Sequence, residues 1–164
     1  MDKTWLVEQL ASRLRQSAQT ARLAMEAAVV EAREGATPSE KRESAQVAQE
    51  SQGLARGHKA RLDRATEELG VLEKFRPPHL APPARVAVGA VVEVEDEGEG
   101  EGRTFFLAPV GAGIELSGPG GDGYLSVVTP ASPVGRAVLG RTVGDTIEVV
   151  VEGDAREWTI TYVE

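Results

Sequence analysis

Small and apolar residues recur every three or four positions through the first half of the chain, which is the spacing of one face of an α-helix. In the first segment these positions are Leu6, Leu10, Leu14, Ala18, Ala21, Met25, Ala28 and Ala32. In the second they are Val47, Ser51, Leu54, His58, Leu62, Ala65, Leu69 and Leu72, a heptad-like seam. The pattern predicts two long helices that pack on each other. Leucines dominate one end of the seam and small residues the other, so we expect a tight root and a looser tip.

Turn signals separate the two predicted helices. Gly35 suits the position just past a helix C-terminus, and Thr37 followed by Pro38 is typical of a helix start. Glu40 stands three residues after Thr37, as in a capping box. A sharp turn over residues 35–40 makes the helices antiparallel, and each helix of about 35 residues is roughly 50 Å long. A short helical bundle or a dimerisation coil is the alternative for this pattern.

The second half shows short alternating or valine-rich runs bounded by glycine and proline, which indicates β-strands. The predicted strands are residues 86–94, 103–107, 114–116, 124–128, 146–151 and 157–163. Ser132–Pro133 opens and Gly140 closes a predicted short helix over residues 133–139. The acidic run 93–101 is expected to be a solvated loop. We therefore expect an antiparallel sheet closed by one short helix, and the fold class is α+β.

Two proline pairs mark the boundary between the halves. Pro77–Pro78 and Pro82–Pro83 cannot continue a helix and favour an extended connector. The charge changes at the same place, because residues 1–76 hold 13 basic and 12 acidic residues whereas residues 77–164 hold 5 and 14. We expect a helical hairpin over residues 1–76 with its tip at about 35–40, a linker over 77–84 and a β-rich domain over 85–164.

The composition narrows the classes of function. The chain of 164 residues contains no cysteine and only two histidines, His58 and His79, which excludes a thiolate site or a multi-histidine metal site. No apolar run is long enough to cross a membrane, and residues 1–4 do not open a signal peptide, so we expect a cytoplasmic protein. A net charge of −8 disfavours binding along a nucleic-acid backbone, so we expect no direct sequence-specific nucleic-acid partner.

One stretch of the second half carries a specific motif. The run S-P-x-G-R-A-x-L-G-x-x-x-G-D over residues 132–145 resembles the C-terminal domain of the Gre factors, GreA and GreB, which are bacterial transcription elongation factors. Residues 31–34, 39–41 and 52–57 resemble the coiled-coil tip and second helix of that family. The resemblance covers most of the chain and implies an antiparallel coiled coil followed by a small FKBP-like domain. It also implies that the partner is bacterial RNA polymerase and that the factor is not itself an enzyme.

The resemblance gives the predicted tip a role. In the family the coiled coil enters the secondary channel of the polymerase, where tip carboxylates help to hold a magnesium ion while the polymerase cleaves backtracked RNA. The family pattern is Asp, two residues, Glu, then Asn, and the matching positions here are Thr37, Glu40 and Lys41. Only the glutamate is retained, and nearby cations disfavour a second Mg²⁺, so we expect weak cleavage stimulation or none.

Two further carboxylates lie near the predicted tip. Glu34 and Glu43 could compensate for the missing aspartate as magnesium ligands in the polymerase complex. The alternative for Glu40 is a capping-box residue with no role at a metal. No cofactor is expected in the free protein, and Mg²⁺ is expected only within the polymerase complex, if it binds at all.

The same resemblance assigns a docking surface to the C-terminal domain. In the family this domain binds a coiled coil at the channel rim through the loop equivalent to Pro130, Ala131, Ser132 and Pro133, with Arg136 nearby. An exposed apolar loop on a rigid sheet suits docking. Ala131 stands where the GreB-like pattern has an aspartate, so one polar contact is missing. The alternative is that the two prolines only shape the turn.

The resemblance implies a factor that binds RNA polymerase through its C-terminal domain and inserts its hairpin into the secondary channel, where it modulates elongation or initiation. We expect it to be a monomer. A free-standing protein-interaction or holdase-type module is the alternative from another class, because a two-helix finger can also grip partner proteins. A peptidyl-prolyl isomerase is disfavoured because such enzymes use an aromatic-lined pocket. The second half offers only Phe105, Phe106, Tyr124, Trp158 and Tyr162.

Overall fold

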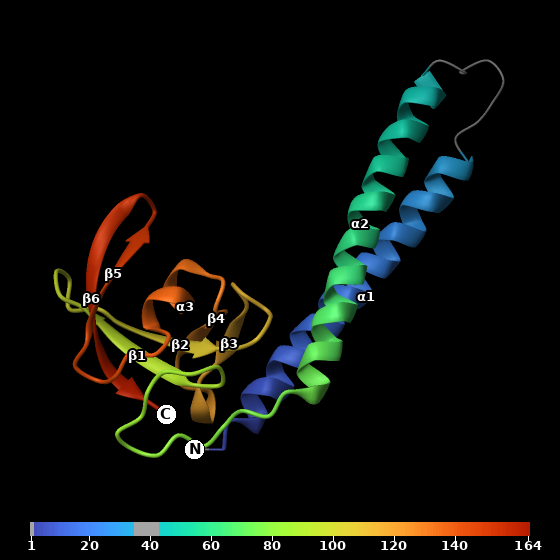
Figure 1. The fold of residues 1–164 in the computed structure, drawn as a ribbon. Coiled ribbons are helices and arrows are strands. Elements are labelled where there is room, and N and C mark those ends of the chain that lie inside the picture. Colours follow the sequence, from blue (N-terminus) through green and yellow to red (C-terminus); the bar gives the residue numbers. More distant parts are fainter. Residues whose placement is uncertain (1, 35–42) are drawn as a thin grey trace. The chain divides into compact units, whose positions relative to one another are not determined.

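The computed structural model describes residues 2–34 and 43–164, and the chain divides into two compact units (Figure 1). The first, called the β unit, comprises Met1–Ala11 and Val71–Glu164. The second, called the hairpin unit, comprises Ser12–Gly70. The predicted α+β fold, a helical hairpin followed by a small sheet with one short helix, is confirmed. The roots of both helices belong with the sheet, so the division between the units passes through the helices.

Two helices form the hairpin, α1 (Thr4–Glu34) and α2 (Glu43–Lys74), which run antiparallel and side by side (Figure 1). The predicted turn, with Thr37, Glu40 and Lys41, lies outside the described residues, as does the side chain of Ala32. Across the two described ranges, no helix is both long enough and apolar enough to span a membrane.

The seam between the helices alternates strictly by three and four residues. On α1 its less exposed positions include Leu14, Ala18, Ala21, Met25 and Ala28, and on α2 they include Ala48, Ser51, Ala55, His58, Leu62 and Ala65. Val47 and Leu54, which the sequence pattern placed in the seam, are 47% and 60% exposed, so that part of the prediction is wrong. Strict alternation places Ala48 and Ala55 in the seam instead, and such small side chains let two helices approach closely.

The β unit is built on one six-stranded sheet with the strand order β3-β4-β2-β1-β6-β5. The strands are β1 (Val91–Asp96), β2 (Gly102–Leu107), β3 (Glu115–Ser117), β4 (Tyr124–Val128), β5 (Thr146–Val151) and β6 (Asp154–Val163). A 3-10 turn, η1 (Pro119–Gly121), precedes β4, and a short helix, α3 (Pro133–Val138), follows it. Neighbouring strands are antiparallel except β2 and β4, so the sheet is mixed rather than wholly antiparallel as predicted.

The parallel pair has a simple topological origin. After β2 the chain moves to the sheet edge, where it forms β3, and then reverses to form β4 between β3 and β2. Two reversals leave β4 pointing in the same direction as β2. Because β3 has only three residues, its alternation is too short to reveal this path from the sequence.

Two strand boundaries differ from the prediction for local reasons. The valine-rich segment 86–90 precedes β1 instead of forming part of it, because Gly89, at φ 98°, turns the chain there. The last strand begins at residue 154, three residues earlier than predicted. Glu152 and Gly153, at φ 54° and 94°, form a two-residue turn whose twist matches that of the flanking strands, so β5 and β6 pair from the turn onward.

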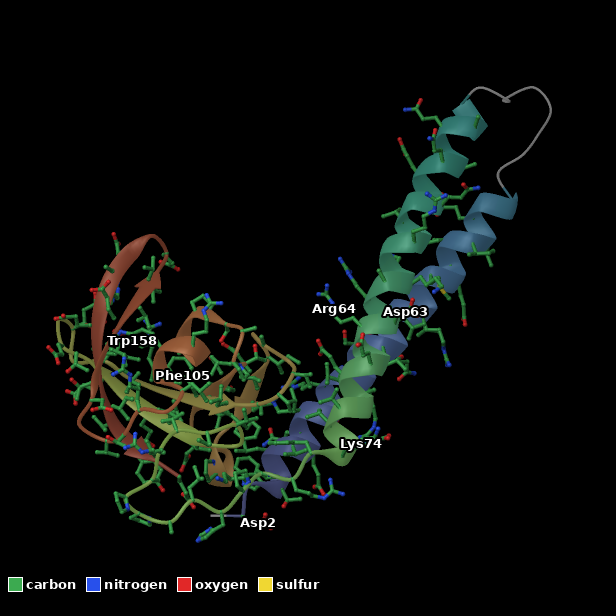
Figure 2. All side chains as sticks on the ribbon, in the orientation of Figure 1. Asp2, Asp63, Arg64, Lys74, Phe105 and Trp158 are labelled. Atoms are coloured by element: carbon green, nitrogen blue, oxygen red, sulfur yellow. The ribbon has the colours of Figure 1, made fainter. Side chains whose placement is uncertain are left out.

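The sheet and α3 enclose the core of the β unit. Its buried residues are Val86, Ala90, Val92, Val94, Phe105, Leu107, Val128, Val138, Ile147, Val149, Trp158, Ile160 and Val163. Burial alternates along β5, as expected for a strand that packs one face on the core. Figure 2 shows Phe105 and Trp158, whose stacked rings have centroids 5.7 Å apart. This core supports α3 and the loop before it.

The first turns of α1 are anchored to the edge of the sheet within the β unit. Leu6 and Leu10 are fully buried, and a Cβ added at Gly111 would come within 2.7 Å of Leu10 Cδ1. Gln9 bonds twice to the backbone of β3, because its Nε2 donates to Ser117 O at 3.3 Å and its Oε1 accepts from Ser117 N at 3.2 Å. The amide side chain therefore satisfies backbone groups at the exposed edge of the sheet.

Candidate functional site

The loop between β4 and α3 is held by a local hydrogen-bond network. Ser132 caps the N-terminus of α3, and its Oγ accepts from Gly135 N at 3.1 Å and from Thr129 N at 3.2 Å. The same hydroxyl donates to Thr129 O at 2.8 Å. Pro133 occupies the first turn of the helix, where its fixed φ fits and its missing N–H costs nothing. The conformation of the loop is therefore set within the free protein.

Gly135 is required by the same loop for a steric reason. A Cβ added at this position would lie 1.9 Å from Thr129 O and 2.9 Å from Ser132 Oγ. Any larger residue must displace the backbone that carries the cap. The glycine of the sequence motif is therefore explained by close packing of α3 against the end of β4.

The last part of the motif also has a structural role. Gly140 and Gly144 adopt φ of 77° and 91°, a region that favours glycine. Asp145 Oδ2 accepts from Thr142 N at 2.8 Å and from Thr142 Oγ1 at 3.2 Å. The backbone hydrogen bond from Thr142 is the main reason why the pKa of Asp145 lies below its ordinary range. These residues shape the turn into β5, so their role in the motif is structural.

Several residues in and just before the motif are at least partly exposed. Ala131, Pro133 and Arg136 are exposed, and Pro130 and Ser132 are half-buried. The Arg136 guanidinium donates from Nη1 to Ala131 O at 2.7 Å, which ties the side chain to the loop. The structure thus brings the five residues predicted for docking, Pro130 to Pro133 and Arg136, into one ordered loop and helix start. The candidate docking surface is defined by these five residues.

Sequence reasoning missed two exposed apolar side chains that follow this surface along the chain. Leu139 is 43% exposed at the C-terminal cap of α3, and Val143 is 56% exposed in the turn before β5. Leu139 was expected within the predicted helix, where an apolar residue ordinarily packs inward. The signal was its position directly before Gly140, because the chain leaves the helix there and no longer holds the side chain against the core.

The predicted tip site lies outside the part of the chain that the structure describes. Glu40 lies outside the described residues, and so do the side chains of Glu34 and Glu43, which mark the ends of α1 and α2. Within residues 2–34 and 43–164, no group of three or more His, Cys, Asp or Glu side chains is arranged to hold a metal ion. The tip residues therefore remain candidates on the sequence pattern.

The acidic run 93–101 is more ordered than predicted, because residues 93–96 belong to β1. Asp96 is only 6% exposed, and its Oδ1 accepts from Gly98 N at 2.8 Å and Glu99 N at 3.1 Å. Its Oδ2 accepts from Trp158 Nε1 at 3.1 Å and from Arg156 Nη1 at 3.3 Å. The bond from Gly98 is the largest cause that lowers the pKa of Asp96. The carboxylate therefore fixes the β1–β2 turn, which corrects the expectation of a wholly solvated loop.

Three aromatic side chains of the β unit are buried, whereas Tyr124 and Tyr162 are 78% and 41% exposed. Phe105, Phe106 and Trp158 are 7%, 0% and 1% exposed. Arg103 covers the Trp158 ring, with its Cζ 5.5 Å from the ring centroid. The packing of the β unit therefore uses these three rings, and they are not available to line an open pocket.

Comparisons with known proteins found relatives of this chain. A family model described as "Transcription elongation factor, GreA/GreB, C-term" matches residues 81–164. The chain is similar to transcription elongation factor GreA of Methylococcus capsulatus, with 30% identity across 99% of this chain and 98% of that protein. GreA of Polaromonas naphthalenivorans is 29% identical, covering 83% of this chain and 78% of that protein. Among solved structures, GreA factor homolog 1 (Gfh1) of Thermus thermophilus matches with a TM-score of 0.41 and 22% identity over 96% of this chain and 92% of that chain.

Proposed function

Because the chain belongs to the GreA/GreB family of transcription elongation factors, whose members act with bacterial RNA polymerase and are not themselves enzymes, we propose how it engages that polymerase. The protein binds as a monomer through its candidate docking surface and inserts the helical hairpin into the secondary channel. Its docking residues are Pro130, Ala131, Ser132, Pro133 and Arg136. In the secondary channel the protein modulates elongation or initiation. Its main effect is to occupy the channel, and it does not stimulate RNA cleavage efficiently.

The observation that carries the docking proposal is the division of the sequence motif into two sets. Backbone geometry and local hydrogen bonds explain the first set, which is Gly135, Gly140, Gly144 and Asp145. The side chains of Ala131, Pro133 and Arg136 are exposed and lie outside the core, although Pro133 fits the helix start and Arg136 donates to Ala131 O. A partner surface accounts for the second set, and the ordered loop lowers the entropy cost of binding it.

The proposal for the tip rests on the sequence pattern. Glu40 is the one carboxylate retained from the family pattern, while Thr37 and Lys41 replace an aspartate and an asparagine. A neutral hydroxyl and an ammonium provide less attraction for a divalent cation than a carboxylate does. Glu34 and Glu43 are the remaining candidates for a metal contact. The chain therefore favours channel occupation over cleavage.

Binding of core RNA polymerase by purified variants tests the docking surface. Arg136→Ala should weaken binding about tenfold, because a charged hydrogen-bond donor is lost. Ala131→Asp should strengthen it if the family's polar contact is restored. Glu115→Ala, an exposed change on β3, is the control and should bind like the wild type. No association of the wild type with core polymerase would remove the proposal.

A transcript-cleavage assay on backtracked complexes tests the tip. The wild type should leave the RNA uncleaved or cleave it slowly, and Thr37→Asp should increase the rate. Rapid cleavage by the wild type that is lost in Glu40→Ala would contradict the proposal of a channel-occupying role. Polymerase binding is measured for each variant, so that a loss of docking is not mistaken for a loss of cleavage.

A protein-interaction or holdase-type module remains the second candidate, because the hairpin exposes large apolar side chains. Leu23, Val30, Val47 and Leu54 are each between 47% and 60% exposed. Competition distinguishes the two functions. An authentic GreA factor should displace this protein from polymerase if both occupy the same channel, whereas an unrelated clamp should stay bound to its partner when GreA is added.

A further inference from the structure

The chain protects one edge of the sheet and leaves the other open. The two edge strands are β3 and β5. At β3 the Gln9 side chain bonds to both backbone groups of Ser117. β5 pairs with β6 alone (Figure 1), and within residues 2–34 and 43–164 no hydrogen bond reaches the backbone on its other side. An edge strand with unpaired N–H and C=O groups is a template for another strand.

The register of the β5–β6 pair identifies the backbone groups that face outward. The two-residue turn makes Val151 and Asp154 a hydrogen-bonded pair, and such pairs alternate along an antiparallel ladder. The other end of the ladder has the same phase, because Ile160 N donates to Asp145 O at 2.9 Å. The residues whose N–H and C=O groups point away from β6 are Thr146, Glu148 and Val150.

β5 lacks the features that usually protect an edge strand. It contains neither proline nor lysine, and its pairing with β6 shows no register shift. Five of its six residues are β-branched, which favours an extended backbone. Val150 is 62% exposed on the open face of the strand. The strand is therefore suited to accept an extended segment through main-chain hydrogen bonds.

The charge on this face selects the kind of segment. Glu148 lies directly opposite Glu157 of β6, and both are exposed. Like charges in directly opposite positions destabilise a sheet. Glu97 adds a third carboxylate, because its Oε1 accepts from Thr159 Oγ1 at 2.6 Å and from Thr146 Oγ1 at 3.4 Å. A cation placed beside Glu148 would relieve this repulsion.

A shallow hollow beside Glu148 leaves space for such a cation. Its volume is about 680 Å³, and it is lined by residues 96–99, 148 and 154–157. Arg156 is the one cation among the described lining residues, and its Nη1 already lies 3.3 Å from Asp96 Oδ2 and 2.7 Å from Glu99 Oε2. The hollow therefore keeps an excess of negative charge that one long basic side chain can neutralise.

We propose that β5 binds an extended segment of a partner protein as a seventh strand, with a lysine or arginine of that segment opposite Glu148. The outward backbone groups of Thr146, Glu148 and Val150 bind the main chain of the segment, and its basic side chain lies over Glu148 and Glu157. A second copy of β5 would bring a glutamate instead of a cation. The proposal uses none of the residues of the candidate docking surface, so it can fail or succeed separately from the proposed function.

Hydrogen exchange of the full-length protein, followed by nuclear magnetic resonance, tests for the added strand. The probe is a nine-residue synthetic peptide with a central arginine, a valine two residues to either side and threonine elsewhere. The reference peptide has glutamate in place of the arginine. The outward amides of Thr146, Glu148 and Val150 should exchange at least about tenfold more slowly when the arginine peptide saturates the protein. The amides of Ile147 and Val149 already bond to β6 and should change less.

Variants then assign the binding to this edge. Glu148→Gln should weaken binding of the arginine peptide about two- to fivefold, because one cross-strand charge pair is lost. Val150→Pro removes an outward N–H that β6 does not use, so it should also weaken binding. Fluorescence of Trp158 shows whether each variant is folded. Glu115→Gln, an exposed glutamate on the opposite edge strand, is the matched control and should bind like the wild type.

Four outcomes would overturn the proposal. They are the absence of saturable binding, binding without slower exchange of the three outward amides, equal affinity for the two peptides, and unchanged affinity in Glu148→Gln. Slower exchange that increases with protein concentration in the absence of peptide would identify a second copy of the chain as the occupant, and it would overturn the proposal as well.

Discussion

At the scale of single residues, Asp96 links three parts of the β unit. Its carboxylate accepts bonds from the β1–β2 turn and from Trp158 and Arg156 on β6. These bonds stabilise the ionised form, so the pKa of Asp96 is lowered in the folded protein, with the backbone bond from Gly98 as the largest cause. In the unfolded chain the pKa of an aspartate is about 3.9.

The lowered pKa of Asp96 makes the stability of the folded protein depend on pH. The stabilisation is complete above the unfolded pKa and is lost as the pH falls through the folded pKa. Asp96→Asn should therefore unfold at lower urea concentration at neutral pH and lose less further stability on acidification. Urea unfolding between about pH 7 and pH 3 measures both effects. An unchanged midpoint at neutral pH would show that the network contributes nothing. Asp145, whose pKa is also lowered, accounts for part of the remaining acid dependence.

Gly135 and Gly57 provide a second residue-scale prediction, because the same substitution should have opposite signs. Gly135→Ala places a methyl group 1.9 Å from Thr129 O, so it should cost about 1–3 kcal/mol and distort the docking loop. Gly57 lies inside α2 with nothing within 4 Å of an added Cβ. Gly57→Ala should therefore stabilise the protein by about 0.8–1.0 kcal/mol. Thermal unfolding compares the two variants, and destabilisation by both would refute the steric distinction.

At the scale of elements, the sequence predicts which helices and strands exist better than it predicts which of their residues pack together. The two long helices, α3 and most strands follow from periodicity and from glycine and proline signals. In the first half of α2, Val47 and Leu54 were predicted to lie in the seam between the helices, because large apolar residues were preferred over alanine at seam positions. Burial follows the repeat of the helix, so Ala48 and Ala55 take those places. The sequence pattern also did not predict the parallel pairing of β2 and β4, since that pairing depends on the order of the strands in the sheet.

The candidate docking surface was predicted only in part. The motif around Ser132 identified the docking loop, because its cap and proline signals are local. Leu139 and Val143 were missed, since their exposure depends on where the chain leaves α3. The burial of Lys3 was also missed, because an isolated lysine near the start of the chain belongs to no periodic pattern.

The corrected seam leads to a prediction for the hairpin. Leu14 is 4% exposed whereas Leu54 is 60% exposed. Leu14→Ala should lower the free energy of unfolding by about 2–5 kcal/mol, because it removes buried methyl groups and leaves a cavity. Leu54→Ala should change it by no more than about 0.5 kcal/mol. Chemical unfolding followed by the helical circular dichroism signal gives both values. Comparable losses would mean that Leu54 packs in the seam after all.

At the scale of the whole molecule, the β unit is not continuous in sequence. It draws on residues 1–11 as well as on residues 71–164. Leu10 packs against Gly111, and Gln9 supplies a donor and an acceptor to the backbone of Ser117. The start of the helical hairpin is therefore also part of the sheet's edge, and folding of the C-terminal sheet depends on the N-terminal residues of the chain.

This dependence is testable in the full-length protein. Leu10→Ala should destabilise the β unit by about 2–5 kcal/mol, because a fully buried leucine is lost beside a glycine that cannot fill the space. Fluorescence of Trp158 in a Trp5→Phe background reports on the sheet alone, since Trp158 lies in its core. Leu23→Ala, an exposed change in the hairpin unit, is the matched control and should leave the Trp158 transition in place. If Leu10→Ala also left it in place, residues 1–11 would be dispensable for the sheet, and the hairpin root would be attached to it without stabilising it.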